Sequence, residues 1–349
     1  MAEEMTKQQV AVDDEQAVDR LREAHQKILG ELRKVIVGMD EVIDEVMIAI
    51  FSRGHALLVG VPGLAKTLLV SSLAQALSLS FKRIQFTPDL MPSDITGTEV
   101  LQDDPGTHER AFKFVKGPVF ANLILADEIN RTPPKTQAAL LQAMQERRVS
   151  AGGEEFALEP PFFVLATQNP IEQEGTYPLP EAQLDRFLFN IMVKYPSWQE
   201  EIDIMKRSPD VAPPSDAEIQ RVLDRNEIIA LQGLVRRIPA AEHIYTYAAT
   251  LARSTRPTEK DVPDFVKDWL SWGAGPRASL YMLLAGKARA ILRGRYHVSI
   301  EDIQTVARPV LRHRIIPNFA AQSEGVTSDD IVDKLIETIP ADEKLYEKA

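Results

Sequence analysis

The stretch Gly60-Val61-Pro62-Gly63-Leu64-Ala65-Lys66-Thr67 decides the fold that this sequence predicts. An apolar run, Ala56 to Val59, precedes it, and a helix-favouring run, Leu68 to Leu77, follows it. Strand, glycine turn and helix form the context of a phosphate-binding loop, because N–H groups at a helix start converge on an anion and the helix dipole favours negative charge. We therefore expect a nucleoside triphosphate to bind here.

The sequence predicts a phosphate contact, a metal ligand and a backbone conformation at three positions of this loop. Lys66 is placed to reach the β- and γ-phosphates, and the Thr67 hydroxyl to coordinate magnesium. Ala65 stands where a glycine usually precedes the lysine. Alanine is tolerable there only with negative φ, so the sequence predicts a negative φ at Ala65.

The composition restricts the class of protein. A chain of 349 residues, 44% of them hydrophobic, can bury a sizeable core in one or two domains. No apolar run approaches the roughly 18 residues of a membrane helix, the acidic start lacks the form of a secretory signal, and cysteine is absent. We expect a cytoplasmic protein that does not insert into a membrane, and no zinc site, because the histidines show no paired spacing.

The formal net charge of −11 argues against binding nucleic acid by bulk electrostatics. One local basic run contains Arg289, Arg293 and Arg295. Such runs are more often solvated helix ends or subunit contacts. The sequence therefore argues against a nucleic-acid partner, and it leaves open whether this run contacts a subunit or a ligand.

The N-terminal residues 1–34 are predicted to be an acidic tail followed by an amphipathic helix. Residues 1–16 are polar and acidic, and we expect them to be disordered. Apolar residues then recur at helical spacing from Ala17 to Val35, at Val18, Leu21, Ile28, Leu32 and Val35. Gly38 interrupts this pattern, and Asp40 is expected to cap a second helix running towards Ser52.

Residues 35–195 alternate short apolar runs with helical stretches. The candidate strands are Ala56–Val59, Phe81–Phe86, Leu123–Ala126, Phe162–Thr167 and Phe187–Val193. Continuous apolar runs between helices predict an α/β fold with a parallel sheet covered on both faces.

Two insertions and a second domain complete the predicted organisation. Thr98–Val115, with Asp103-Asp104-Pro105-Gly106, and Arg148–Leu158, with Gly152-Gly153, each read as an inserted hairpin. Residues 196–349 lack strand patterns and predict an all-helical domain with breaks at Pro213-Pro214 and Arg256-Pro257.

Two carboxylates, Asp127 and Glu128, directly follow the apolar run Leu123–Ala126. The C-terminal end of a strand is where ligands bind in open α/β sheets. We expect Asp127 to hold Mg²⁺, directly or through water, and Glu128 to orient and deprotonate an attacking water.

Asn169 and Arg186 are further candidates for the hydrolytic site. Asn169 ends the fourth strand, where its amide can hydrogen-bond a γ-phosphate and the attacking water; alternatively it caps a turn before Pro170. Arg186 lies between a helix and a strand, where it can reach a nucleotide held by a neighbouring subunit of a ring. The alternative for Arg186 is a surface pair with Asp185.

The segment Gly275-Pro276-Arg277 predicts a helix start, because proline suits the first turn. A cation at that end of a helix is disfavoured unless an anion lies nearby. Arg277 is therefore a candidate for a phosphate contact.

Together these segments resemble the MoxR family of AAA+ ATPases. The matching segments are Gly60–Thr67 with its alanine before the lysine, Phe86 to Gly97, Asp127 to Gln137, Ala166 to Pro170 and Glu174 to Phe187. The resemblance runs from about Val35 to Ile316. Two departures are Met39, where a glutamine is usual, and Gly275, where a serine is common.

The resemblance implies an AAA+ P-loop NTPase core over 35–195 and a helical lid over 196–349, assembled as a hexameric ring that binds ATP and Mg²⁺ between subunits. It implies a nucleotide site made of Val37, Gly38, Gly60, Val61, Pro62, Gly63, Leu64, Ala65, Lys66, Thr67 and Leu68. Asp127 and Thr67 would serve the metal, and Glu128 would be the base. Asn169 would be the first sensor, Arg186 a finger acting in trans, and Arg277 a second sensor acting in cis or in trans.

The resemblance further implies a chaperone-like remodeller with a protein client and a partner that contains a von Willebrand factor A domain. The inserted hairpins would face the ring's pore or its partner. Two other functions stay open at this point: a nucleotide-gated assembly scaffold and a nucleic-acid motor.

Overall fold

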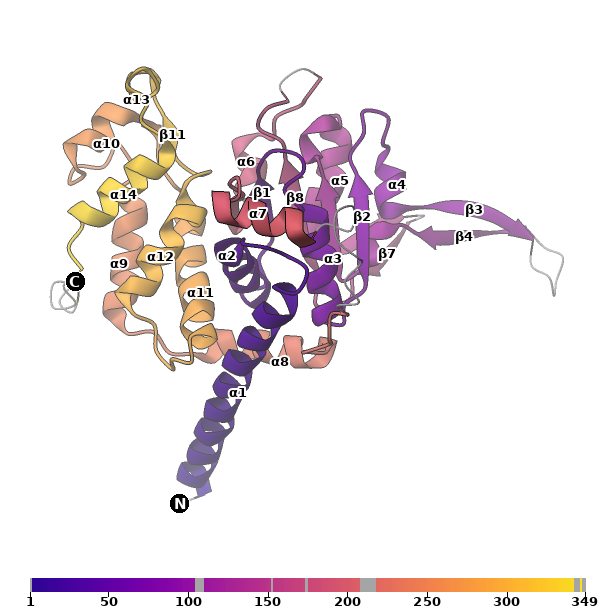
Figure 1. Ribbon diagram of the computed structural model, residues 1–349, viewed down its shortest axis with the longest axis horizontal. Helices are drawn as coiled ribbons and strands as arrows, with labels where there is room; N and C mark the ends of the chain where they lie inside the picture. Colours follow the sequence, from indigo (N-terminus) through magenta and orange to yellow (C-terminus); the bar gives the residue numbers. More distant parts are fainter. Residues whose placement is uncertain are drawn as a thin grey trace.

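A five-stranded parallel sheet forms the centre of the molecule in the computed structural model, which describes residues 2–103, 110–151, 153–172, 175–207, 218–341 and 346 (Figure 1). In spatial order its strands are β2 (Phe81–Gln85), β5 (Leu123–Asp127), β8 (Phe163–Gln168), β1 (Ala56–Val59) and β9 (Phe189–Met192). All neighbouring strands run parallel. The five predicted strands and their parallel pairing are confirmed, with small differences at the strand ends.

Helices cover both faces of this sheet because successive side chains of each strand point to opposite sides. Leu58 of β1 belongs to one apolar core, with α1 (Ala2–Leu32), α2 (Asp40–Phe51) and α3 (Lys66–Ala76). Leu57 belongs to the other core, with α5 (Pro134–Glu146) and the short α4 (Pro92–Thr96). The alternation within one strand therefore fixes two separate layers of helix.

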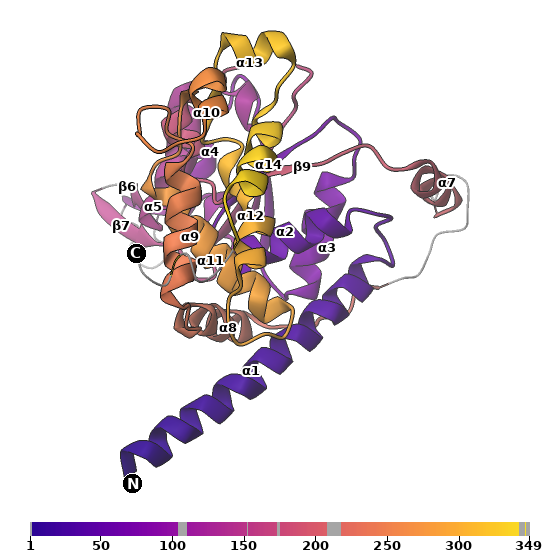
Figure 2. The same ribbon diagram turned by 90° about the vertical axis from the view of Figure 1, so that its left-hand side faces the viewer.

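The first helix begins earlier than the sequence predicts. It runs from Ala2 to Leu32, so the expectation of disorder for residues 1–16 is wrong from Ala2 onwards. Its C-terminal half is anchored by the fully buried Val18, Leu21 and Ile28. Extending a formed helix costs little when the added residues are good helix formers, and Ala2–Gln16 is rich in Ala, Glu and Gln. The helix projects beyond the rest of the molecule (Figures 1 and 2).

Both inserted hairpins are confirmed. β3 (Gly97–Asp103) pairs antiparallel with β4 (Arg110–Lys116), and β6 (Arg148–Ala151) pairs with β7 (Glu154–Ala157). The first hairpin extends away from the sheet on the side opposite the helical domain (Figure 1). The predicted turn residues Asp104–Gly106 and Gly152 lie outside the described residues, as do Glu174 and the Pro213-Pro214 break.

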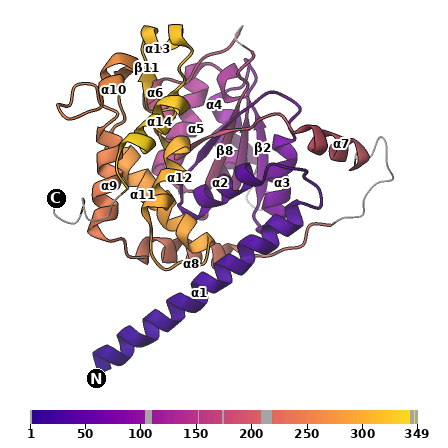
Figure 3. The same ribbon diagram turned by 60° about the vertical axis from the view of Figure 1, so that its left-hand side comes forward.

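The second domain is helical, as predicted, with one short addition. Its helices are α8 (Arg225–Arg237), α9 (Glu242–Arg253), α10 (Asp264–Trp269), α11 (Pro276–Leu292), α12 (Ile300–Leu311), α13 (Phe319–Glu324) and α14 (Ser328–Thr338). The addition is an antiparallel pair of β10 (Leu270–Trp272) and β11 (Ile316–Pro317), too short to give a strand pattern in the sequence. A separate helix, α7 (Trp198–Arg207), stands apart from these helices in Figures 2 and 3.

The basic run near Arg289 is occupied by internal ion pairs. Arg289 and Arg295 both bind the carboxylate of Asp302, which is fully buried at the start of α12. Arg293 pairs with Asp44 of α2 at 2.5 Å. These arginines join α11 to its neighbours, so they do not form a free cationic surface.

No helix among the described residues is long and apolar enough to cross a membrane.

His55 links the start of β1 to both α5 and β8 from a buried position. Its Nδ1 accepts a hydrogen bond from the Val164 N–H at 3.0 Å, so Nε2 carries the proton and donates to the Met144 carbonyl at 3.3 Å. Burial disfavours the charged ring and lowers the pKa of His55 from 6.5 to about 4. His55 is therefore neutral near pH 7.

This pKa predicts a loss of stability in mild acid. Between pH 6.5 and pH 4 the unfolded chain takes up a proton that folded His55 refuses, so the free energy of unfolding falls by about 3 kcal/mol as the pH drops. Urea unfolding of wild type and His55→Gln at pH 6.5, 5 and 4 tests this. The substitution should remove this part of the pH dependence, and equal pH dependence in the two proteins would contradict it.

Wild type and His55→Gln must be compared because Glu45 changes the free energy of unfolding in the opposite direction as the pH falls. Burial raises the pKa of Glu45 from 4.5 to about 7, so its contribution to stability falls as the pH rises through this range. Glu45 is present in both proteins, so its contribution cancels in the difference.

Candidate functional site

The C-terminal edge of the sheet brings the predicted loop and carboxylates together. β1 and β5 both pair with β8 and run in the same direction, so the residues that follow these three strands emerge side by side. The Gly60 N–H donates to the carbonyl of Gln168 at 3.2 Å, which joins the loop to the end of β8. The edge thus gathers the 60–67 loop, Asp127 with Glu128, and Asn169.

The loop depends on glycine for close approach at one position and for backbone conformation at another. A Cβ on Gly60 would lie 2.7 Å from the Val193 carbonyl at the end of β9. Gly63 has a φ of +83°, in the region that favours glycine.

Ala65 also adopts the left-handed region, with φ 50° and ψ 23°, so the predicted negative φ is wrong. The conformation costs an alanine about 1 kcal/mol. Ala65 is exposed, so its small Cβ meets solvent, and the surrounding loop holds the strain.

The loop presents donors at the start of α3. No described residue accepts a backbone hydrogen bond from the N–H groups of Gly63, Leu64 or Ala65. Lys66 Nζ donates to the carbonyls of Gly60 at 2.5 Å and Val61 at 3.3 Å, which folds the ammonium over the loop. These N–H groups and the ammonium suit a phosphate chain.

Lys66 lies within the electrostatic range of both carboxylates. Burial lowers the pKa of Lys66, and the charges of Asp127 and Glu128 act against that shift. The positive loop and the negative strand end therefore face the same space.

Asp127 is held by two neighbours that the sequence reasoning missed. Thr167 Oγ1 donates to Asp127 Oδ1 at 2.6 Å, and Arg83 donates to Oδ2 through Nε at 2.9 Å and Nη2 at 2.6 Å. Thr167 stands near the end of a buried apolar strand, which is a signal in the sequence. Arg83 has no such signal, because the strand Phe81–Gln85 carries a second cation, Lys82, beside it.

Glu128 leaves the strand in a strained conformation. Its φ of 58° and ψ of 49° lie in the left-handed region, which costs a non-glycine residue about 1–3 kcal/mol and clusters at functional sites. Its N–H donates to Thr167 Oγ1 at 2.8 Å. Its Oε2 accepts from Gln85 at 3.0 Å and from Arg131, in the 3₁₀ turn Ile129–Arg131, at 3.0 Å. The carboxylate is thereby fixed beside Asp127.

Asn169 makes the turn-capping contact that the sequence allows, and its contact with a γ-phosphate stays a prediction. Its Oδ1 accepts the N–H of Ile171 at 3.1 Å, which is the turn-capping contact. Its side-chain NH₂ makes no hydrogen bond to the described part of the chain, so this donor stays available at the sheet edge.

The donor set at this edge fits Mg²⁺. The ion usually takes one or two protein ligands and keeps several waters. The Thr67 hydroxyl has no hydrogen-bond partner among the described residues, so it is available as a ligand. Asp127 Oδ2 is already paired with Arg83, so contact through a water suits this carboxylate better than a direct bond.

Val37 and Gly38 lie before α2 and beside α7. Gly38 has a φ of +69°, and a Cβ there would come within 2.4 Å of Glu200 Oε1. Met39 and Leu64 are both partly buried against the large apolar core that contains α2 and α3.

Arg186 and Arg277 lie at the other edge of the sheet. Arg186 precedes β9, whose first residue pairs with Ala56 at the start of β1, whereas the phosphate loop follows the end of β1. A four-residue strand spans roughly 13 Å. The structure therefore brings these two arginines together and keeps both away from the loop of their own chain.

Asp185 is the partner of Arg277 and not of Arg186. Arg277 Nη1 lies 3.1 Å from Asp185 Oδ2, and Arg314 Nε lies 2.8 Å from Oδ1. The anion that offsets a cation at the start of α11 is therefore present within the chain. The alternative of an Asp185–Arg186 pair is not observed.

Arg314, which the sequence analysis did not single out, fixes this region. It is buried and donates to the carbonyls of Phe187 at 2.6 Å and Asp185 at 3.1 Å. Its guanidinium lies over the ring of Tyr281, 5.0 Å from the centroid. This arginine joins the segment around Arg186 to the helical domain.

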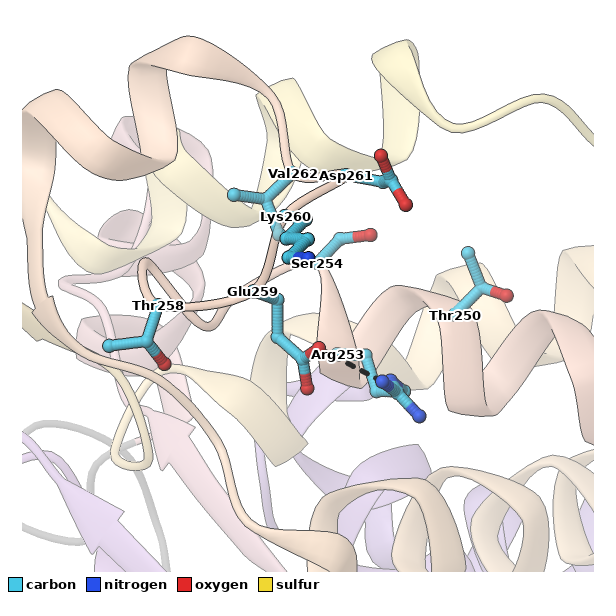
Figure 4. Close-up of a pocket in the computed structure, with 8 residues that line it drawn as sticks. All are labelled: Thr250, Arg253, Ser254, Thr258, Glu259, Lys260, Asp261 and Val262. Atoms are coloured by element: carbon cyan, nitrogen blue, oxygen red, sulfur yellow. Dashed lines mark hydrogen bonds and ion pairs between the residues drawn. The ribbon is translucent and has the colours of Figure 1, made fainter.

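A separate hollow of about 510 Å³ lies in the helical domain (Figure 4). Its lining residues are Thr250, Arg253, Ser254, Thr258, Glu259, Lys260, Asp261 and Val262. Arg253 and Glu259 pair across it at 2.9 Å. Because these charges neutralise each other, we place no functional site there.

Comparison with known proteins agrees with this geometry. Residues 55–189 match the model of the ATPase family associated with various cellular activities (AAA), and residues 265–335 match the AAA lid domain. The chain is 42% identical to chaperone MoxR1 of Mycobacterium tuberculosis over 314 residues, which cover 90% of this chain and 81% of the relative. It is 31% identical to protein MoxR of Methylorubrum extorquens over 335 residues, 92% of this chain and 96% of the relative.

A solved structure is also similar to this chain over nearly its full length. A protein from Cytophaga hutchinsonii, described as a candidate ATPase, superposes with a TM-score of 0.87 at 39% sequence identity, covering 95% of this chain and 99% of its own.

The loop geometry predicts that Lys66→Ala abolishes nucleotide binding. The substitution removes the ammonium that lies over the loop while leaving the helix start and its N–H groups in place. Titration with a fluorescent ATP analogue measures the affinity, and circular dichroism checks the fold. An affinity equal to that of the wild type would exclude the loop as the phosphate site.

Proposed function

We infer that this chain, which belongs to the MoxR family of AAA+ ATPases, hydrolyses ATP to ADP and phosphate and uses the cycle to remodel a client protein. One observation carries the hydrolytic part of this proposal. Thr167 is hydrogen-bonded to both Asp127 and Glu128, at the sheet edge that also carries Lys66. Thr167 thus fixes the Asp127 carboxylate and the Glu128 backbone beside the phosphate loop, and Gln85 and Arg131 hold the Glu128 carboxylate.

Each residue at this edge has a proposed role. Lys66 and the loop N–H groups bind the β- and γ-phosphates, and Val37 and Gly38 border the base. Bound Mg²⁺, held by Thr67 and by Asp127 through water, would neutralise phosphate charge. Glu128 orients the attacking water and accepts its proton, and the Asn169 NH₂ group donates to the γ-phosphate or that water.

The positions of Arg186 and Arg277 support assembly into a ring, in which we propose six copies. Both arginines lie at the sheet edge opposite the phosphate loop of their own chain. A second copy that presents this edge to the nucleotide would bring both guanidinium groups to the γ-phosphate, where they would offset transition-state charge. We therefore place Arg277, like Arg186, in trans.

The client role rests on similarity. One relative is a chaperone by name. From the family resemblance alone we propose a partner with a von Willebrand factor A domain. The proposed setting is the cytoplasm, which supplies ATP and Mg²⁺. A nucleic-acid motor has less support, because Arg289, Arg293 and Arg295 are paired within the chain.

The proposed base predicts the behaviour of Glu128→Gln. This variant should bind ATP with near wild-type affinity and lose at least 100-fold in turnover, because an amide cannot accept the proton of water. Phosphate release measures turnover, and light scattering measures the mass of the assembly with ATP bound. Turnover at the wild-type rate would refute this role, and an ATP-bound ring without turnover in the wild type would favour the assembly scaffold.

The trans arrangement predicts which pairs of inactive variants restore each other. Arg186→Ala should keep its ATP affinity and lose turnover. Mixed with Glu128→Gln it should recover part of the activity, because some interfaces then combine an intact base with an intact arginine. Mixed rings no more active than the separate variants would contradict action of Arg186 in trans.

The same approach decides the position of Arg277. If Arg186 and Arg277 act on one neighbouring site, no interface between Arg186→Ala and Arg277→Ala subunits is complete, and the mixture should stay inactive. If Arg277 acts in cis, the mixture gains complete interfaces and activity returns. Arg277→Ala mixed with Glu128→Gln is the positive control for trans action.

A further inference from the structure

Five arginines surround one cavity at the N-terminal edge of the sheet. The cavity has a volume of about 290 Å³ and lies beside His55. The arginines come from five different segments of the chain: Arg53, Arg147, Arg186, Arg236 and Arg277. The ring proposal gives roles to Arg186 and Arg277 and leaves the other three unexplained.

Positive charge in this cavity is not balanced by the described part of the chain. Arg277 pairs with Asp185, and the ion pairs of the described residues include none for Arg53, Arg147, Arg186 or Arg236. His55 adds neither charge nor a free acceptor, because both of its ring nitrogens are hydrogen-bonded. In a chain with a net charge of −11, such a concentration of cations needs a specific reason.

Two further observations show that the charged guanidinium of Arg53 is destabilised in this cavity. A bound anion would offset that destabilisation. Arg53 Nε is buried and has no hydrogen-bond partner within the described ranges, and such a group loses its hydration without replacement. Burial, together with the positive charges of Arg236 and Arg147, lowers the pKa of Arg53. The three guanidinium groups are therefore close enough to repel one another.

The backbone of Arg147 adds an independent indication. It ends α5 in the left-handed conformation, with φ 54° and ψ 32°, where glycine is the usual residue. A side chain in this conformation costs stability and is often kept for function. The strained backbone therefore indicates a functional role for the Arg147 guanidinium.

We propose that Arg53, Arg147 and Arg236 complete, with Arg186 and Arg277, one polyphosphate site that receives the triphosphate held by a neighbouring copy. Guanidinium groups pair with phosphate oxygens through two parallel hydrogen bonds, and a triphosphate supplies enough oxygens for several arginines. The proposal that the phosphates belong to a neighbouring copy rests on the ring proposed above. The proposal that this cavity binds phosphate does not depend on that ring.

The first experiment tests the anion site without hydrolysis. All proteins carry Lys66→Ala, which disables the phosphate loop, and tripolyphosphate is the probe. Its dissociation constant, measured by calorimetry, should rise at least tenfold when Arg147→Gly is added, which is the effect expected of one lost charged hydrogen bond. Arg148→Gln is the matched control, because Arg148 is the next residue and pairs with Glu155 instead.

Arg147→Gly also separates function from folding. Glycine suits the left-handed backbone, so the variant should be as stable as its parent or more stable, even as it loses the anion. Equal tripolyphosphate affinity in the Arg147→Gly and Arg148→Gln proteins would overturn the site.

The second experiment tests the source of the phosphate in chains with an intact Lys66. Arg147→Gly should lower ATP turnover about tenfold or more, recover part of it when mixed with Glu128→Gln, and recover none with Arg186→Ala. Loss of tripolyphosphate binding with unchanged turnover would assign the cavity to a free phosphate and overturn the neighbouring triphosphate as its source. A wild type without turnover would count against the proposed hydrolysis, while the first experiment would still decide the anion site.

Discussion

The parallel direction of the five strands is the constraint on which the rest of this structure depends. Parallel strands give a sheet two chemically different edges. Here the C-terminal edge carries the phosphate loop, Asp127, Glu128 and Asn169, and the N-terminal edge carries the arginine cavity. Cations that would stabilise a hydrolytic transition state are thereby separated from the nucleotide site of the same chain. The geometry of one sheet is thus the physical basis for proposing that the complete site needs two copies.

Each edge is held by a buried polar contact between elements that are distant in the sequence. Thr167 fixes both carboxylate residues at one edge, and Arg314 fixes the segment from Asp185 to Leu188 at the other. Removing Arg314 would leave Asp185 paired with Arg277 alone and would take a donor from the carbonyls of Phe187 and Leu188. The contacts of Arg314 also connect the α/β domain to the helical domain. A movement of the helical domain would therefore be transmitted to the segment that carries Arg186.

Backbone strain occurs where the proposed chemistry is concentrated. Ala65, Glu128 and Arg147 are all non-glycine residues with positive φ, and they lie in the phosphate loop, beside the carboxylate proposed to serve the metal, and in the arginine cavity. Each is followed or preceded by a well-packed helix or strand, which supplies the stability that a strained residue costs. At each of these three residues, the backbone conformation that the site uses lowers the stability of the folded chain.

The sequence by itself determined the sheet, the phosphate loop and the carboxylates, because these depend on local patterns: apolar runs of strand length, glycine spacing, and polar residues directly after a strand. It did not determine the φ of Ala65, the extent of α1, or the pairing of Arg289, Arg293 and Arg295 with carboxylates. Nor did it reveal Arg83, Thr167 and Arg314, or unite Arg53, Arg147 and Arg236 in one cavity. The ion pairs, the buried contacts and the cavity depend on residues up to 249 positions apart in the sequence, and only tertiary structure decides which of many possible charge partners come within hydrogen-bonding distance.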